Sequence, residues 1–137
     1  MTTLYIAGPM TGYRQFNFPA FHEAAIAVRA MGFEVISPAE MDEESDVAEK
    51  AMCSVSGDLV AAGITETWGD LLARDVKIVS DEVDGICLLP GWEDSRGARL
   101  EAFVGILCDK NFYMYRHGAV FEITAAEVLR EVYDATV

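Results

Sequence analysis

The sequence predicts a single-domain α/β protein over residues 1–137, with a doubly wound (Rossmann- or flavodoxin-like), mainly parallel sheet and helices on both faces. Three observations support this prediction. Short apolar runs typical of strands alternate with longer segments in which apolar residues recur at helical spacing. Three of the strand runs stop at glycine or proline breaks. The length of 137 residues is enough for one domain to bury a core without disulfides.

The N-terminal part is predicted to form a βαβ unit. Residues 4–7 are a strand signal that Gly8-Pro9 stops. A helix is expected from Pro19 to Gly32, followed by a strand at residues 33–36. Because the two strands are joined by a helical crossover, they should pair in parallel.

Residues 40–66 differ in composition and periodicity from the segments on either side of them. They begin acidic, become small and polar, and have weak periodicity, so we expect a loop with a marginal helix and a possible lid. The elements expected next are a helix over 67–80, a strand over 86–89, a helix over 95–108, a strand over 112–115 and a helix over 124–133. In such a sheet, ligands bind beyond the carboxyl ends of the strands, which points to loops 8–18, 37–40 and 90–97.

The charge of the chain limits its partners. Ten Lys and Arg against 23 Asp and Glu give a formal net charge of −13. This charge repels nucleic-acid backbones and anionic membrane surfaces, so neither is expected as a partner. A small anionic nucleotide is still compatible, because backbone N–H groups and one or two local arginines can hold a phosphate.

Residues that bind metals or form disulfides are sparse. Cys53, Cys87 and Cys108 are scattered without CxxC spacing, and His22 and His117 are far apart. We therefore expect no disulfide framework and no metal, and no motif indicates an organic cofactor. No apolar stretch approaches the roughly 20 residues of a membrane span, so a cytoplasmic protein is expected, in the host cytoplasm if a phage encodes it.

The loop after the first strand contains Gly8, Pro9, Met10 and Gly12. It is neither a GxGxxG fingerprint nor a P-loop. Its glycines allow the backbone to approach a ligand closely. An ordinary strand-to-helix turn explains the segment equally well.

The segment that follows the third strand is more informative. Ser95 is the expected N-cap of a helix whose first-turn N–H groups could bind an anion. Glu101 lies further along, between Gly97 and Gly105, and a helical glycine costs about 1 kcal/mol relative to alanine. These glycines suggest space for a ligand beside Glu101, whereas a solvated surface glutamate is the alternative. We expect an apolar stripe of the helix to face the sheet, namely Leu100, Phe103, Val104 and Leu107.

A second carboxylate near Glu101 would suit glycosidic chemistry, because one group can attack or stabilise an oxocarbenium-like centre while another handles a proton. Asp75 is the candidate, and a surface ion pair with Arg74 explains it equally well. Trp68 is either a core residue or a stacking platform for a base.

Several short segments carry a family resemblance: Tyr5–Pro9, Ser37-Pro38, Trp68 with Arg74-Asp75, Asp84–Ile86 and Leu89–Glu101. Together they resemble the nucleoside 2-deoxyribosyltransferase-like superfamily, specifically its small, often phage-encoded branch of unknown function, and are similar to 2′-deoxynucleoside 5′-monophosphate N-hydrolases. The string from Ser95 through Gly97 to Glu101 is the most specific part.

The resemblance implies that Glu101 attacks C1′ of a nucleoside or nucleotide and that the sugar then passes to another base or to water. It implies that Tyr5 helps to hold Glu101 and that Asp75 binds or protonates the base. Ser95 matches a serine of the 5′-monophosphate hydrolases, which implies a phosphorylated substrate. The residues implied near the substrate are Gly8, Pro9, Met10, Gly12, Trp68, Ser95 and Gly97. A homo-oligomer is also implied. Several hydrolases of the family have an arginine close to the first-loop glycine, whereas the nearest here is Arg14.

Two other functions compete with this one. A nucleotide-binding sensor or sequestering protein would keep the pocket without turnover, and Asp75 or Glu101 turned away from the pocket would favour it. A module whose acidic residues 40–49 mimic nucleic acid would need a continuous acidic face, but the charges are dispersed. An N-glycosyl hydrolase or deoxyribosyltransferase is therefore the first hypothesis.

Overall fold

The computed structural model describes residues 1–41 and 50–136. Its centre is a five-stranded sheet with the order β2-β1-β3-β4-β5. The strands are β1 (Thr3–Ala7), β2 (Glu34–Ile36), β3 (Gly85–Leu88), β4 (Asn111–Arg116) and β5 (Ala119–Ile123). β1 pairs in parallel with β2 and β3, β3 pairs in parallel with β4, and β5 runs antiparallel to β4. The predicted α/β class with a mainly parallel sheet is confirmed.

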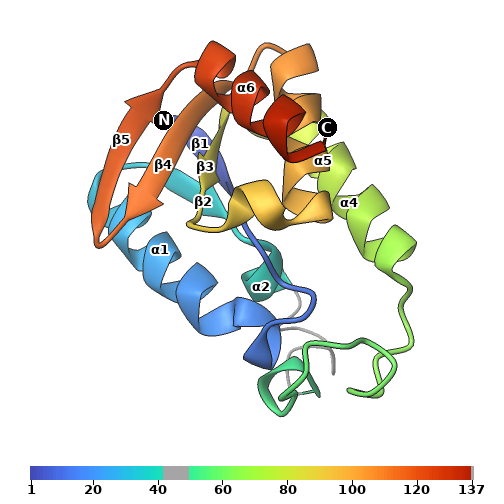
Figure 1. Cartoon of the computed structure of the whole chain (residues 1–137). Coiled ribbons are helices and arrows are strands. Elements are labelled where there is room, and N and C mark those ends of the chain that lie inside the picture. Colours follow the sequence, from blue (N-terminus) through green and yellow to red (C-terminus); the bar gives the residue numbers. More distant parts are fainter. Residues whose placement is uncertain (42–49, 137) are drawn as a thin grey trace.

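Helices cover both faces of this sheet (Figure 1). They are η1 (Arg14–Asn17), α1 (Phe18–Ala30), α2 (Pro38–Met41), α4 (Trp68–Asp81), η3 (Trp92–Asp94), α5 (Arg96–Leu107) and α6 (Ala125–Thr136). Because side chains alternate along a strand, Leu4 and Ile6 of β1 pack with α1, whereas Tyr5 and Ala7 face α4, α5 and α6. This alternation turns Tyr5 toward α5.

The hairpin at one edge of the sheet is absent from the sequence prediction. β4 and β5 are joined by His117 and Gly118, whose φ angles are 50° and 82°. Two successive left-handed residues form the tight turn that suits an antiparallel hairpin. The sequence carries this signal, a turn dipeptide ending in glycine between two runs of β-forming residues. The sheet therefore has five strands instead of the four expected.

The predicted orientation of α5 is wrong. Leu100 and Phe103 are each 39% exposed and Leu107 is 68% exposed, so of the predicted stripe only the partly buried Val104 packs against the core. The buried residues of α5 are instead Ala98, Glu101, Ala102 and Gly105. A Cβ at Gly105 would lie 2.5 Å from Ile86 Cδ1, so this glycine lets the helix approach β3 and leaves no space for a ligand there. The small residues thus carry Glu101 toward the sheet.

The topology opens a crevice at one end of the sheet. The chain passes from β1 to β2 on one side and then crosses to β3 on the other side of β1. Open α/β sheets bind ligands where the strand order reverses in this way, beyond the carboxyl ends of the strands. The loops that follow β1 and β3 border this crevice.

Candidate active site

A cavity of about 260 Å³ lies beyond the carboxyl ends of β1 and β3. Its walls come from the loop after β1, from Leu59, from α4 and from the start of α5. Eight of the ten residues predicted from the sequence line it: Gly8, Pro9, Met10, Trp68, Asp75, Ser95, Gly97 and Glu101. The fold therefore brings three distant parts of the candidate site together around one space.

Glu101 is nearly buried, with 5% of its surface exposed. Tyr5, which is fully buried, donates its hydroxyl hydrogen to Glu101 Oε2 at 2.5 Å. The hydrogen bond joins β1 to α5 and fixes the direction of the carboxyl group. Tyr5 does not itself line the cavity, so its contact with a ligand would pass through Glu101. The alternative of a solvated surface glutamate is wrong.

The environment of Glu101 favours its neutral form. Burial, followed by the charge of Asp75, raises the pKa of Glu101 to about 8, while the Tyr5 hydrogen bond and the Arg74 charge act in the opposite direction. Burial and the charge of Glu101 also raise the pKa of Tyr5 well above its ordinary value, so the phenol stays a donor. Burial and the neighbouring carboxylate therefore make the protonated form of Glu101 easier to keep near neutral pH than it is for an exposed glutamate.

Asp75 comes from the inner side of α4 and is 9% exposed. The start of α4 is fixed by a capping box, in which Thr67 and Asp70 each accept the other's backbone N–H. Helical spacing from this start places Trp68 and Asp75 along the same wall of the cavity. Arg74 Nε donates to Asp75 Oδ1 at 2.9 Å. Asp75 thus both forms the ion pair weighed from the sequence and faces the cavity with Glu101.

The start of α5 has the predicted cap. Ser95 Oγ accepts the N–H of Ala98 at 3.2 Å. A Cβ on Gly97 would have Leu72 Cδ1 at 3.9 Å and Trp68 Nε1 at 4.0 Å as its nearest neighbours, so this glycine borders open space. The first-turn N–H groups of α5, which have no partner within the helix, therefore lie beside the cavity.

Trp68 lies at the outer part of the cavity rather than in the core, because 39% of its surface is exposed. The guanidinium carbon of Arg96 lies 5.1 Å from the centroid of its indole ring. Arg96 is exposed and lines the same cavity. Sequence reasoning passed over Arg96, although it stands between the two small residues of the Ser95–Gly97 motif.

The loop after β1 is held in place by residues 50–66, which lie beside it in Figure 1. The N–H groups of Gly12 and Gln15 donate to carbonyl oxygens of that segment at 2.9 and 2.7 Å. Gln15, Phe16 and Asn17 are all left-handed, with φ of 55°, 51° and 61°. This conformation costs non-glycine residues roughly 1–2 kcal/mol each. It accompanies the placement of Phe16 in the cavity wall, whereas Gly12 does not line the cavity.

The predicted lid over residues 40–66 and the acidic segment at residues 40–49 are described only in part. Residues 42–49 lie outside the described residues. Residues 50–66 contribute Leu59 to the cavity wall and bury Ala51 and Ile64 against the core. This part of the segment belongs to the packed structure.

The chain matches the sequence model of a protein family. The family model described as a domain of unknown function, DUF4406, matches residues 2–112, which is most of the chain. The chain belongs to the DUF4406 family. All candidate residues of this DUF4406 protein, from Tyr5 to Glu101, lie within the matched part. No curated protein matches the chain.

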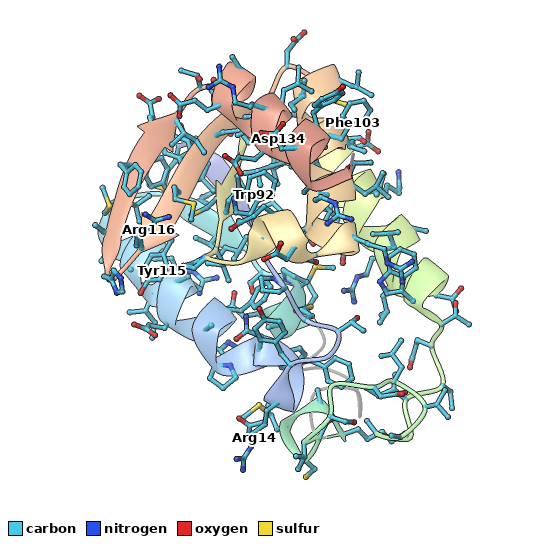
Figure 2. All side chains as sticks on the ribbon, viewed as in Figure 1. Arg14, Trp92, Phe103, Tyr115, Arg116 and Asp134 are labelled. Atoms are coloured by element: carbon cyan, nitrogen blue, oxygen red, sulfur yellow. The ribbon has the colours of Figure 1, made fainter. Side chains whose placement is uncertain are left out.

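The DUF4406 protein has further cavity residues that sequence reasoning did not select. They are Thr11, Tyr13, Phe16, Leu59, Leu71, Leu72, Asp94, Arg96 and Ala98. Five of these nine residues lie in loops 8–18 and 90–97, where a ligand was expected, but no motif distinguished them within those loops. Arg14, in contrast, points outward in Figure 2, is exposed and does not line the cavity. The described residues of loop 37–40 do not line it either.

The chemistry available to the DUF4406 protein rests on its two carboxyl groups. Glu101 is nearly buried and accepts from a phenol, and Asp75 accepts from a guanidinium. Within residues 1–41 and 50–136, no three His, Cys, Asp or Glu side chains are placed to share a metal ion. In the same ranges, no helix is long and apolar enough to cross a membrane. Two carboxyl groups that face one cavity can divide the roles of nucleophile and proton donor.

Proposed function

We propose that the protein cleaves the N-glycosidic bond of a nucleoside 5′-monophosphate, as an N-glycosyl hydrolase or a deoxyribosyltransferase. The observation that carries the proposal is the nearly buried Glu101, which accepts from Tyr5 and shares a cavity with Asp75. The resemblance to the nucleoside 2-deoxyribosyltransferase-like superfamily adds the kind of bond and the 5′-phosphate. Carboxyl groups that are buried beside a cavity and have a raised pKa occur often at functional sites, which favours a chemical role for Glu101.

The proposed reaction has two displacements. The carboxylate of Glu101 attacks C1′, the C1′–N bond breaks with its electron pair on the base, and Asp75 donates a proton to that base. Water, or a second base, then attacks C1′ of the glycosyl ester. The proton of the attacking group returns to Asp75, and Glu101 leaves as a carboxylate.

This scheme uses one proton on the carboxyl pair. Burial and the charge of Asp75 raise the pKa of Glu101 to about 8, which favours the proton on Glu101 before substrate binds. The reactive form is the one in which the proton has moved to Asp75 and Glu101 is ionised. Tyr5 supports that form, since its hydrogen bond stabilises the charged carboxylate.

The proposed enzyme is cytoplasmic, acts on a small nucleotide, and uses neither a metal nor an organic cofactor. The family resemblance also leads us to propose an assembly of two or more copies, which light scattering of the purified protein would measure. A monomer at assay concentration would oppose that part of the proposal.

The decisive experiment follows base release by chromatography. Wild-type protein is incubated with ribo- and deoxyribonucleoside 5′-monophosphates, with and without a free acceptor base. We expect release from at least one substrate, and its loss in Glu101→Gln, which keeps the shape of the side chain. Glu131→Gln is the matched control, because Glu131 is an exposed residue of α6.

The outcomes separate the proposed enzyme from its rival. Release that persists in Glu101→Gln would remove Glu101 from the reaction. Tight binding of a nucleotide by the wild-type protein without release from any substrate would favour the sensor or sequestering protein. A new nucleotide formed only when an acceptor base is present would identify a transferase.

A further inference from the structure

The cavity has an unfavourable charge for a phosphorylated ligand. The chain has a net charge of −13, and the acidic residues that line the cavity are Asp75, Asp94 and Glu101. Among the described lining residues, Arg96 is the cationic one. Binding of a phosphate dianion in such surroundings requires a local positive charge.

The other arginines near the site have different positions. Arg74 pairs with Asp75 at 2.9 Å, and Arg99 donates to the backbone oxygen of Glu93 at 3.0 Å. Arg14, on the first loop, points outward (Figure 2). None of these three residues lines the cavity, which leaves Arg96 as the arginine that can meet a ligand there.

Trp68 holds the guanidinium of Arg96 at this place. The guanidinium carbon is 5.1 Å from the indole centroid, so α4 and α5 each provide one member of a cation–π pair. A guanidinium held over a ring in this way keeps N–H donors that can bind phosphate oxygens in a fork. The pair therefore places the guanidinium of Arg96 beside the cavity before a ligand arrives.

We propose that Arg96, positioned by Trp68, binds the 5′-phosphate and makes the protein select phosphorylated over unphosphorylated nucleosides. This inference rests on the proposed function, since it assigns one end of the same substrate. Arg96 is exposed and Glu101 is nearly buried, so the phosphate lies outward and the glycosidic bond lies inward. Five residues of helix separate the two positions, roughly 8 Å along the axis, which a pentose with its 5′-carbon can span.

The test measures binding without turnover. Calorimetry with ribose 5-phosphate and with ribose is carried out on wild-type protein, Arg96→Gln and Arg116→Gln. Arg116 is the matched control, because its loss changes the net charge equally and it lies at the exposed end of β4, away from the cavity (Figure 2). We expect Arg96→Gln to weaken ribose 5-phosphate binding by roughly 10- to 100-fold, the effect of one charged hydrogen-bonding group, and Arg116→Gln by less than about 2-fold.

Trp68 is tested as a positioning residue. Trp68→Phe keeps an aromatic face and should retain most of the affinity for ribose 5-phosphate, whereas Trp68→Leu should lose much of it. The positioning role is supported if Trp68→Leu loses affinity for ribose 5-phosphate and also loses the preference for ribose 5-phosphate over ribose. Equal affinity in Trp68→Phe and Trp68→Leu would overturn it.

The result distinguishes this inference from the proposed function. Wild-type protein that binds ribose 5-phosphate no better than ribose, or equal losses in Arg96→Gln and Arg116→Gln, would overturn the role of Arg96. Base release from unphosphorylated nucleosides would in that case still support the glycosidase proposal without the role of Arg96. Conversely, phosphate binding that depends on Arg96 in a protein that releases no base would support the inference and oppose the proposed reaction.

Discussion

Replacing Glu101 by glutamine should stabilise the protein at alkaline pH while it abolishes base release. In the folded protein, burial and the charge of Asp75 raise the pKa of Glu101 from its ordinary 4.5 to about 8. The folded state therefore binds this proton more tightly than the unfolded chain does. The contribution to stability is fully present below pH 4.5 and is lost progressively as the pH rises to 8.

The size of the effect follows from the same values. Each pH unit between the unfolded and folded pKa corresponds to about 1.4 kcal/mol. Between pH 5 and pH 9, the free energy of unfolding of the wild-type protein should fall by about 4 kcal/mol relative to Glu101→Gln, which has no proton to lose. Titrating groups that do not interact with Glu101 contribute equally in the two proteins, so their contributions cancel in the difference.

Urea denaturation at pH 5, 7 and 9 measures this difference. Glu131→Gln, which changes an exposed residue of α6, should track the wild-type protein at each pH. A difference between wild type and Glu101→Gln that stays constant with pH would refute the reasoning, because Glu101 would then have the same pKa in both states.

Three further predictions concern the neighbours of Glu101 and the first loop. Tyr5→Phe removes the hydrogen bond that lowers the pKa of Glu101, so that pKa should rise further above its ordinary value, measured by carbon NMR of labelled glutamate; an unchanged titration would contradict this. Asp75→Asn should slow base release roughly 10²- to 10⁴-fold with little effect on ribose 5-phosphate binding, and a wild-type rate would exclude Asp75 as the proton donor. Gly57→Ala should lower the free energy of unfolding in urea by about 2–3 kcal/mol, because φ is 68° and the new Cβ would lie 2.3 Å from the backbone oxygen of Tyr13. Gly63→Ala, with φ of 78° and open space around it, should cost only about 1 kcal/mol, and equal losses would show that the contact does not matter.

The order of strands and helices could be predicted because each element carries its own period. The apolar spacing between Pro19 and Gly32 agrees with α1, and the apolar run at residues 86–89 agrees with β3 to within one residue. β5 was missed because it is largely exposed, so its sequence lacks the apolar run that marks a buried strand. The final hairpin depends on a turn at His117-Gly118, a feature of backbone angles rather than of period.

Residues of the candidate site could be predicted where a sequence motif sets their spacing. They were missed where tertiary packing determines their position. Ser95, Gly97 and Glu101 were selected through their spacing, and all three line the cavity. The inner face of α5 was misassigned because hydrophobicity alone selects Phe103, whereas the sheet accepts the smaller Gly105 at close approach. The position of Arg96 in the site depends on its contact with Trp68 of another helix, and no local sequence pattern predicts that contact.

The left-handed turn at Gln15–Asn17 bears on the order in which this chain folds. Its strain is offset by contacts with residues 50–66, which lie some forty positions away in the sequence, so neither partner is stable before the intervening loop has closed. The β1–β3 sheet and its helices can assemble first, since their pairings do not require the turn. The wall of the cavity that contains Phe16 should therefore form late, and hydrogen exchange of the amides at 12–17 should report an opening that leaves the sheet intact.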